Sequence, residues 1–215
     1  MDRQIESAKA PSGQPWERNS WLPVATVESV VEINEQVLAL LRAQCLVDSG
    51  QPALIRDISD LLLKLDETSL QRAATSTVLL ADAGFADAGL WSDAVIGAVN
   101  DRPASHPAPF FTVDGTAAVM RLVMTHAWQL ARSEPAAARL LLGLSAANLG
   151  VIGGCTLSRL TRLAETRCQW LRPRWESRPR FWCDLLRAAG EGESGALQRL
   201  RARALQLLAA DARQG

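Results

Sequence analysis

The stretch Cys155–Asp184, CTLSRLTRLAETRCQWLRPRWESRPRFWCD, carries the clearest structural signals in this chain of 215 residues. Its first part has apolar side chains at helical spacing after a threonine, which predicts an amphipathic helix over Thr156–Thr166 with Thr156 as its N-cap. Its second part mixes arginines with aromatic residues and predicts a contact surface. The residues of that part are Arg172, Arg174, Arg178 and Arg180, with Trp170, Trp175, Phe181 and Trp182 interspersed.

The composition predicts an all-α fold. Hydrophobic residues make up 48% of the chain and charged residues 21%, which is ordinary for a globular protein and argues against general disorder. Alanine, leucine and arginine are abundant, tyrosine is absent, and β-branched residues form no alternating runs. The chain is long enough to bury a core as one domain or as two small ones. We therefore expect a helical bundle.

Charge is distributed unevenly, although the formal net charge is zero. Residues 1–154 hold 11 Lys/Arg against 17 Asp/Glu, whereas residues 155–215 hold 12 against 6. A basic C-terminal third predicts contact with an anionic partner or with the acidic first part. Arginine suits bidentate contacts with phosphate or carboxylate groups. A high-GC genome enriches the same residue, so the charge pattern alone does not choose between these explanations.

Helical periodicity and turn residues predict two helical units with a break between them. Three prolines, Pro103, Pro107 and Pro109, mark the break, and Asp114 or Thr116 is expected to cap the next helix. The expected organisation is a flexible tail at 1–23, an N-terminal helical unit at 24–100, a Pro-rich linker at 101–112 and a C-terminal unit at 113–215. Helices are expected at about 27–47, 52–65, 66–80, 90–99, 116–132, 136–142, 156–166, 180–189 and 196–210.

The helices on the two sides of the linker follow a similar order, which is what an internal duplication would produce. Pro52-Ala53 and Pro135-Ala136 hold similar places, as do Leu90–Asp93 and Phe181–Asp184. The first pair is offset by 83 residues and the second by 91, so a duplication requires an insertion near 143–154. Few residues match outright, and helical hairpins that begin with proline resemble one another by chance.

No pattern of catalytic, metal-ligating or cofactor-binding residues stands out. The four cysteines form no CxxC pair, and no glycine-rich phosphate loop follows a predicted strand. His126 lies on an apolar helix face, a position that suits a core histidine better than a general base. We expect no enzyme activity, no metal and no cofactor.

The sequence predicts a cytoplasmic protein with reduced thiols. Its first 20 residues are polar and lack the apolar segment of a signal peptide. No apolar run approaches the roughly 18 residues that a membrane span needs. We therefore expect no contact with a membrane.

Two interpretations of the arginine-aromatic segment remain at this point. In the first interpretation the arginines neutralise DNA phosphates, while Trp175 and its neighbours fix the segment to the body of the protein. These arginines are Arg172, Arg174, Arg178 and Arg180. In the second, the tryptophans belong to the core and the arginines form a solvated face paired with Asp and Glu.

The region Ala118–Trp175 resembles the FlhD family, the small all-helical subunit of the bacterial flagellar master transcription activator. The similar features are a helix that ends QLAR, a break followed by PAAARL, then LGL, and the helix TLSRLTRLAET with a basic-aromatic tail. This match covers about 58 residues, and Val31–Asn34 before a leucine-rich helix looks like the family's N-terminal helix. The chain then looks like two tandem FlhD-like units. The family's chain-linking cysteine would fall near Leu171, so its disulfide is not carried over.

The resemblance implies a dimeric protein that assembles with an FlhC-like subunit and helps it to bind promoter DNA and activate transcription. In this chain it implies either self-association or a pseudo-dimer within one polypeptide. The expected function is thus a transcriptional regulator subunit for flagellar or mobile-element genes, with Arg172, Arg174, Trp175, Arg178 and Arg180 as the DNA- or partner-binding residues. The alternative is a helical adaptor or chaperone-like subunit of a secretion, conjugation or motility apparatus that does not bind DNA.

Overall fold

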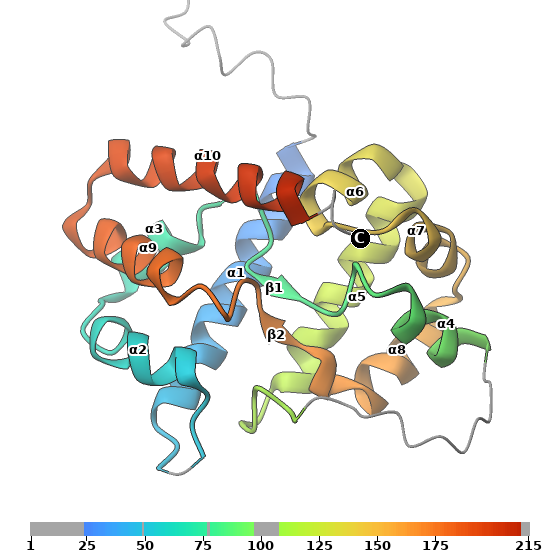
Figure 1. The fold of residues 1–215 in the computed structure, drawn as a ribbon, viewed down its shortest axis with the longest axis horizontal. Coiled ribbons are helices and arrows are strands. Elements are labelled where there is room, and N and C mark those ends of the chain that lie inside the picture. The colour runs from blue at the N-terminus through green and yellow to red at the C-terminus, as the bar shows by residue number, and fades with distance from the viewer. Residues whose placement is uncertain (1–23, 49, 77, 97–107, 212–215) are drawn as a thin grey trace, which may run out of the picture.

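The computed structural model describes residues 24–48, 50–76, 78–96 and 108–211, and this part of the chain is mostly helical (Figure 1). The prediction of an all-α fold is confirmed. The predicted tail at 1–23 and residues 101–107 of the predicted linker lie outside the described residues. The first half contains α1 (Val24–Cys45), α2 (Ala53–Leu62), α3 (Glu67–Ala74), a short strand β1 (Ala81–Asp82) and α4 (Ala88–Ile96).

The second half likewise consists of helices and one short strand. It contains α5 (Thr116–Ser133), α6 (Pro135–Leu142), α7 (Ala146–Gly153), α8 (Leu157–Thr166), a 3-10 turn η2 (Cys168–Trp170), β2 (Arg172–Pro173), α9 (Pro179–Glu191) and α10 (Ser194–Asp211). Thr156 accepts a hydrogen bond from the Arg159 amide, which confirms it as the N-cap of α8. The N-cap of α5 is Gly115, with φ 88°, instead of Asp114 or Thr116. The Thr116 hydroxyl bonds the Val113 carbonyl instead.

The third helix ends at Ala74, six residues before its expected end at Leu80. Asn34 of α1, which is fully buried, explains the difference. Its side-chain nitrogen donates to the carbonyls of Ala74 and Val78, each at 3.1 Å, and its oxygen accepts from the Leu80 amide at 2.8 Å. These bonds satisfy backbone groups that a longer helix would pair internally. The helix α3 therefore ends, and the chain continues in an extended conformation to β1.

The two halves exchange a helix. Strands β1 and β2 pair antiparallel, with Ala81 opposite Pro173 and Asp82 opposite Arg172. Beyond this pair α9 packs against α2 and α3 of the first half, and α4 packs against α7 of the second half (Figure 1). The Arg72 side chain of α3 reaches across to the Ala189 carbonyl of α9 at 2.8 Å. We call the group of α1, α2, α3 and α9 one lobe and the group of α4, α5, α7 and α8 the other, so each lobe contains helices from both halves.

The contacts in the two lobes correspond. α1 packs against α2 and α3 as α5 packs against α7 and α8, and α1 and α5 contact each other between the lobes. Helices α4 and α9 begin 91 residues apart, at Ala88 and Pro179, and a shift of 91 residues maps the β1–β2 register onto itself. This correspondence relates α2 to α7, whereas the sequence comparison had matched its first residues with Pro135-Ala136 at the start of α6.

Buried side chains from both halves form one continuous core. Phe110 and Phe111, inside the predicted linker, belong to this core. Helices α6 and α10 have no counterpart among the described elements of the first half, and they pack against each other. The division of the chain into two units stays a prediction about how the chain is built.

Candidate functional site

The arginine-aromatic segment forms the crossing between the lobes. It begins at Trp170 in η2, continues through β2 and a turn over 174–178, and ends in the first turns of α9. Its aromatic side chains are core residues: Trp170, Trp175, Phe181 and Trp182 are each at most 8% exposed. Trp175 meets Phe181 edge to face, with ring centroids 4.7 Å apart. The aromatics thus hold the segment in place, as both sequence interpretations expect.

The structure buries Arg174, one of the predicted DNA-contact residues. The residue is 6% exposed, and its guanidinium donates to the Ala81 carbonyl through Nε and Nη2 and to the Leu142 carbonyl through Nη2. These bonds tie β1 and the end of α6 to the crossing. Burial lowers the pKa of the Arg174 guanidinium, and the charges of Asp82 and Asp211 oppose that change. Arginine nevertheless remains protonated in proteins.

Trp175 has a strained backbone. Its φ of 55° makes it the one non-glycine residue with positive φ among the described residues. Bulky side chains rarely adopt this left-handed conformation, which costs about 1–2 kcal/mol. The conformation accompanies a hydrogen bond of 2.9 Å from the Trp175 Nε1 atom to the Asp211 carboxylate at the end of α10. The turn is therefore held by contacts from a distant helix.

The other predicted arginines lie nearer the surface. Arg172 pairs with Glu176 at 2.8 Å and donates to the Ala108 carbonyl. Arg178 pairs with Asp211 at 3.4 Å, and both side chains are about two-fifths exposed, so this pair contributes little stability. Arg180 is exposed in the first turn of α9.

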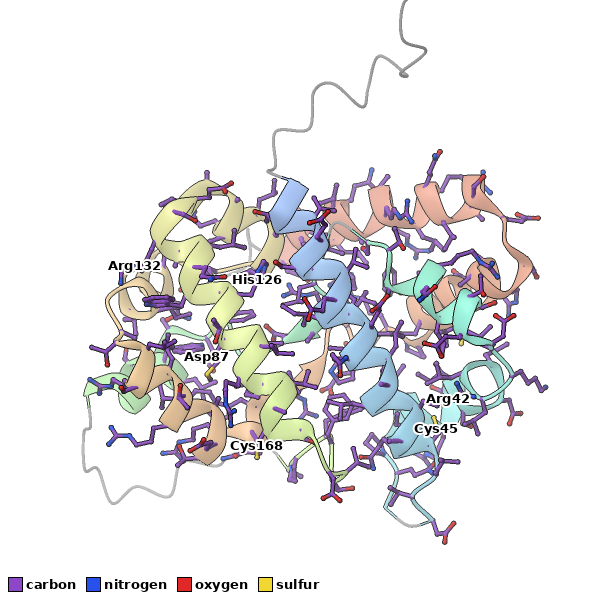
Figure 2. The ribbon with its side chains drawn as sticks, turned by 180° about the vertical axis from the view of Figure 1, so that it is seen from behind. Arg42, Cys45, Asp87, His126, Arg132 and Cys168 are labelled. Atoms are coloured by element: carbon purple, nitrogen blue, oxygen red, sulfur yellow. The ribbon has the colours of Figure 1, made fainter. Side chains whose placement is uncertain are left out.

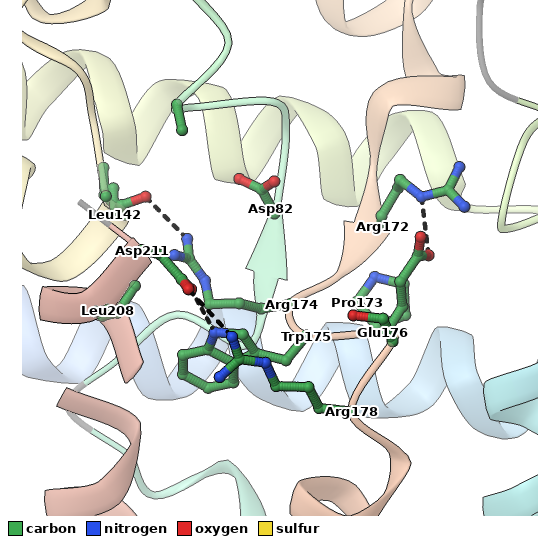
Figure 3. A pocket seen from close by; sticks show the side chains of 13 residues that line it. Asp82, Leu142, Arg172, Pro173, Arg174, Trp175, Glu176, Arg178, Leu208 and Asp211 are labelled. Carbon is green, nitrogen blue, oxygen red and sulfur yellow. Dashed lines mark hydrogen bonds and ion pairs between the residues drawn. The ribbon is translucent and has the colours of Figure 1, made fainter. Parts of the chain in front are cut away.

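A pocket of about 290 Å³ opens over this turn (Figure 3). All three of Arg172, Arg174 and Arg178 line it, as do the carboxylates of Asp82, Glu176 and Asp211. The Trp175 ring and Leu208 of α10 supply an apolar wall. The structure therefore brings four of the five predicted site residues to one pocket, whereas Arg180 does not line it.

A second basic surface, not predicted from the sequence, lies between α9 and α10. Arg187, Arg199 and Arg203 are exposed along a groove of about 350 Å³. Arg187 and Arg203 share one carboxylate, that of Asp184, at 3.6 Å each. The groove carries Glu191 as well, so its three arginines outnumber its acids. The arginines at 199, 201 and 203 are the sequence feature that could have indicated this basic surface. Only the packing of α10 on α9 shows that Arg199 and Arg203 line the groove.

His126 is buried in the core, as its position on an apolar helix face predicted, but its side chain is not fully hydrogen-bonded as expected of a core histidine. It lies between α5 and the first turns of α1 (Figure 2), and burial lowers its pKa to about 4. Its Nε2 atom is buried without a hydrogen-bond partner in the described part of the chain. All four cysteines are free thiols. Across the described ranges, no group of three or more His, Cys, Asp or Glu side chains is placed to hold a metal ion.

No protein-family model, curated protein or solved structure matches this chain. The similarity to the FlhD family therefore depends on the residues quoted above. Within 24–48, 50–76, 78–96 and 108–211, no single helix is long and apolar enough to cross a membrane. Helices α6 and α7 together reach that length and composition, but they are bent by 119° at the break between them.

Proposed function

We propose that this chain is an FlhD-like transcriptional regulator subunit that acts with an FlhC-like partner to bind promoter DNA. The observation that supports the proposal most is the correspondence between the two exchanged sets of helices. The resemblance implies dimeric proteins, and two corresponding sets of helices in one polypeptide are what a pseudo-dimer requires. Such a subunit would act in the cytoplasm, without a cofactor, and would control the transcription of flagellar or mobile-element genes.

The proposal assigns different roles to the predicted arginines. A phosphate contact needs an arginine that reaches solvent, and Arg178 and Arg180 do so. The exposed Arg187, Arg199 and Arg203 extend this basic surface along α9 and α10. Arg174 and Trp175, by contrast, hold the turn from which Arg178 projects. We therefore place DNA or partner contact on the exposed arginines of α9, α10 and the turn before them.

The test is retention of promoter DNA by the purified protein together with its co-purifying partner, measured over a series of salt concentrations. The regulator proposal expects affinity that falls steeply with salt, because arginines that contact phosphates release counterions from DNA. Replacing two phosphate-contacting arginines, as in Arg180→Gln with Arg199→Gln, should lower the slope of log affinity against log salt by about 2. Arg56→Gln on α2 is the control and should leave the slope unchanged.

One result decides against the proposal. If the protein with its partner shows no salt-sensitive retention of DNA, the chain acts as the adaptor or chaperone-like subunit that is the alternative. In that case the double variant should instead weaken binding of the partner protein, which the same purification measures.

A further inference from the structure

A pocket of about 230 Å³ lies where α3 meets the turn between α9 and α10 (Figure 1). Gly192 makes this turn with φ 71°, a left-handed conformation that favours glycine. The turn brings the start of α10 beside Arg72 of α3, whose Cζ atom would be 4.0 Å from a Cβ added at Gly192. The pocket is thus lined by a helix of the first half and a helix of the second.

Two arginines line this pocket, and of the described residues no acidic side chain does. The arginines are Arg72 and Arg201, and within the described ranges neither forms an ion pair within 4.0 Å. Asp66 lies near Arg72: hydrogen bonds from Ser69 lower the pKa of Asp66, and the charge of Arg72 lowers it further. Asp66 does not line the pocket, however. The pocket therefore has an excess of positive charge, unlike the pocket at the crossing, where three arginines face three carboxylates.

Arg201 is the less compensated of the two cations. It is half-buried, and its guanidinium bonds no other residue in the part of the chain that the structure describes. Burial lowers the pKa of the Arg201 guanidinium, and no acidic side chain opposes this change as Asp82 and Asp211 do for Arg174. A cation partly removed from water without a counter-charge is stabilised by an anion that comes beside it.

Arg72 is already held in position for such an anion. Its Nε atom donates to the Ala189 carbonyl at 2.8 Å and its Nη2 atom to the Ser69 hydroxyl at 2.7 Å, and neither bond uses Nη1. A donor that is fixed in advance loses little conformational freedom on binding. The exposed side chains of Ser194 and Gln198 add neutral donors to the same pocket, and the first turn of α10 adds its partial positive charge.

We propose that this pocket binds a phosphate group, as inorganic phosphate or as a small phosphate monoester, between Arg72 and Arg201. Such a group carries about −1.5 to −2 charges at pH 7 and so compensates both arginines, whereas a carboxylate compensates only one. The guanidinium fork also matches the spacing of phosphate oxygens. The volume of about 230 Å³ limits the ligand to a phosphate group with a small substituent.

This inference does not depend on the proposed function. Arg199 and Arg203 of the proposed contact surface line the groove on the α9 side of α10, whereas Arg201 lines the pocket on the α3 side. A phosphate between Arg72 and Arg201 would connect α3 to α10 and so stabilise the folded chain.

The test follows the backbone amide resonances of Gly192 and Ser194, which line the pocket, in the full chain at pH 7. Sodium phosphate replaces sodium chloride at constant ionic strength. The expected result is a shift of both resonances that saturates with phosphate, while the amide resonance of Arg56 on α2 does not shift. Sodium acetate is the comparison, and it should bind at least about tenfold more weakly because it carries one charge.

A matched set of variants on α10 locates the bound phosphate. Arg201→Gln should weaken phosphate binding at least about tenfold, because it removes a charge-assisted hydrogen bond. Arg201→Lys keeps the charge and should weaken it less. Arg199→Gln removes the same charge from the α9 side of the helix and should change phosphate affinity by less than about threefold. Thermal unfolding without phosphate checks that each variant is folded.

Methyl phosphate separates the two sources of the phosphate group. If it binds as tightly as inorganic phosphate, the pocket accepts the phosphate of a small ester. If only inorganic phosphate binds, the pocket is specific for the free ion. Both results support the proposal.

Three results would overturn it. If phosphate causes no saturating shift at Gly192 and Ser194, Arg201 is only a solvated cation. If Arg199→Gln weakens binding as much as Arg201→Gln, phosphate responds to the general charge of α10 and not to this pocket. If acetate binds as tightly as phosphate, the charge argument that selects a dianion is wrong.

Discussion

Gly84 and Trp175 lie 91 residues apart and occupy corresponding positions, each with a left-handed backbone, at φ 68° and 55°. The same offset relates Trp91 to Trp182. Each of these indoles is fully buried and donates its Nε1 hydrogen to a nearby upstream carbonyl, that of Gly84 at 3.1 Å and that of Arg174 at 2.9 Å. Both halves therefore make the same sharp turn between strand and exchanged helix. In the first half a glycine makes it without strain, and in the second a tryptophan makes it at a cost.

Replacing the glycine of this pair should destabilise the protein. Gly84→Ala forces a side chain into the left-handed region, and the added Cβ meets the Leu90 side chain. We expect the free energy of unfolding to fall by about 1–2 kcal/mol in urea denaturation. Gly150→Ala is the control, because it lies in α7 with open space around it, and it should raise stability by about 0.5–1 kcal/mol. Equal effects at the two sites would show that the left-handed turn is not required.

Helix caps and apolar periodicity could be predicted because they are local. Thr156 caps α8, and Pro135 and Pro179 stand in the first turns of α6 and α9. The exchange of α4 and α9 could not be predicted, since it depends on which lobe each helix reaches after the β1–β2 pair. The burial of Arg174 was missed for the same reason. An arginine beside tryptophans is typical of a surface contact. The carbonyls of Ala81 and Leu142, which accept hydrogen bonds from Arg174, are distant in the sequence and only the fold brings them close.

Asn34 was another polar residue whose role the sequence concealed, and it supplies a second prediction. Asn34→Leu keeps the branched shape of the side chain but leaves the Val78 carbonyl and the Leu80 amide without this partner, whereas the Ala74 carbonyl still accepts from the Ser76 amide at 2.7 Å. Each of these two buried, unsatisfied backbone groups costs about 1–3 kcal/mol, so the free energy of unfolding should fall by about 2 kcal/mol or more. Gln36→Leu, at an exposed position of the same helix, should change it by less than about 0.5 kcal/mol. A similar effect for both variants in urea denaturation would contradict the role of Asn34.

Arg174 and Arg172 should differ sharply in their tolerance of lysine. A lysine at 174 cannot bond the Ala81 and Leu142 carbonyls with the same fork and leaves a buried ammonium, so Arg174→Lys should cost about 2–4 kcal/mol. Arg172→Lys keeps a charge opposite Glu176 in a pair that is about one-third exposed, and it should cost less than about 1 kcal/mol. Thermal and urea unfolding of both variants measure the difference. Equal costs would mean that the crossing does not depend on the Arg174 bonds.

His126 should make the protein less stable in acid. Its pKa is about 4 in the folded protein because burial disfavours the charged form, against an ordinary value of 6.5 in the unfolded chain. Between these two pKa values the unfolded chain binds a proton at His126 and the folded protein does not. The contribution of the neutral histidine to stability is therefore fully present above pH 6.5 and is lost as the pH falls toward 4. The largest loss is about 3 kcal/mol.

His126→Leu removes the titrating group while it keeps an apolar side chain in the core. The variant should therefore lose less stability than the natural protein between pH 6.5 and pH 4, measured by urea denaturation at several pH values. Carboxylates that titrate in the same range contribute equally to both proteins, so the difference between the two curves isolates the histidine. Parallel curves would show that His126 becomes protonated without disturbing the contact between α1 and α5.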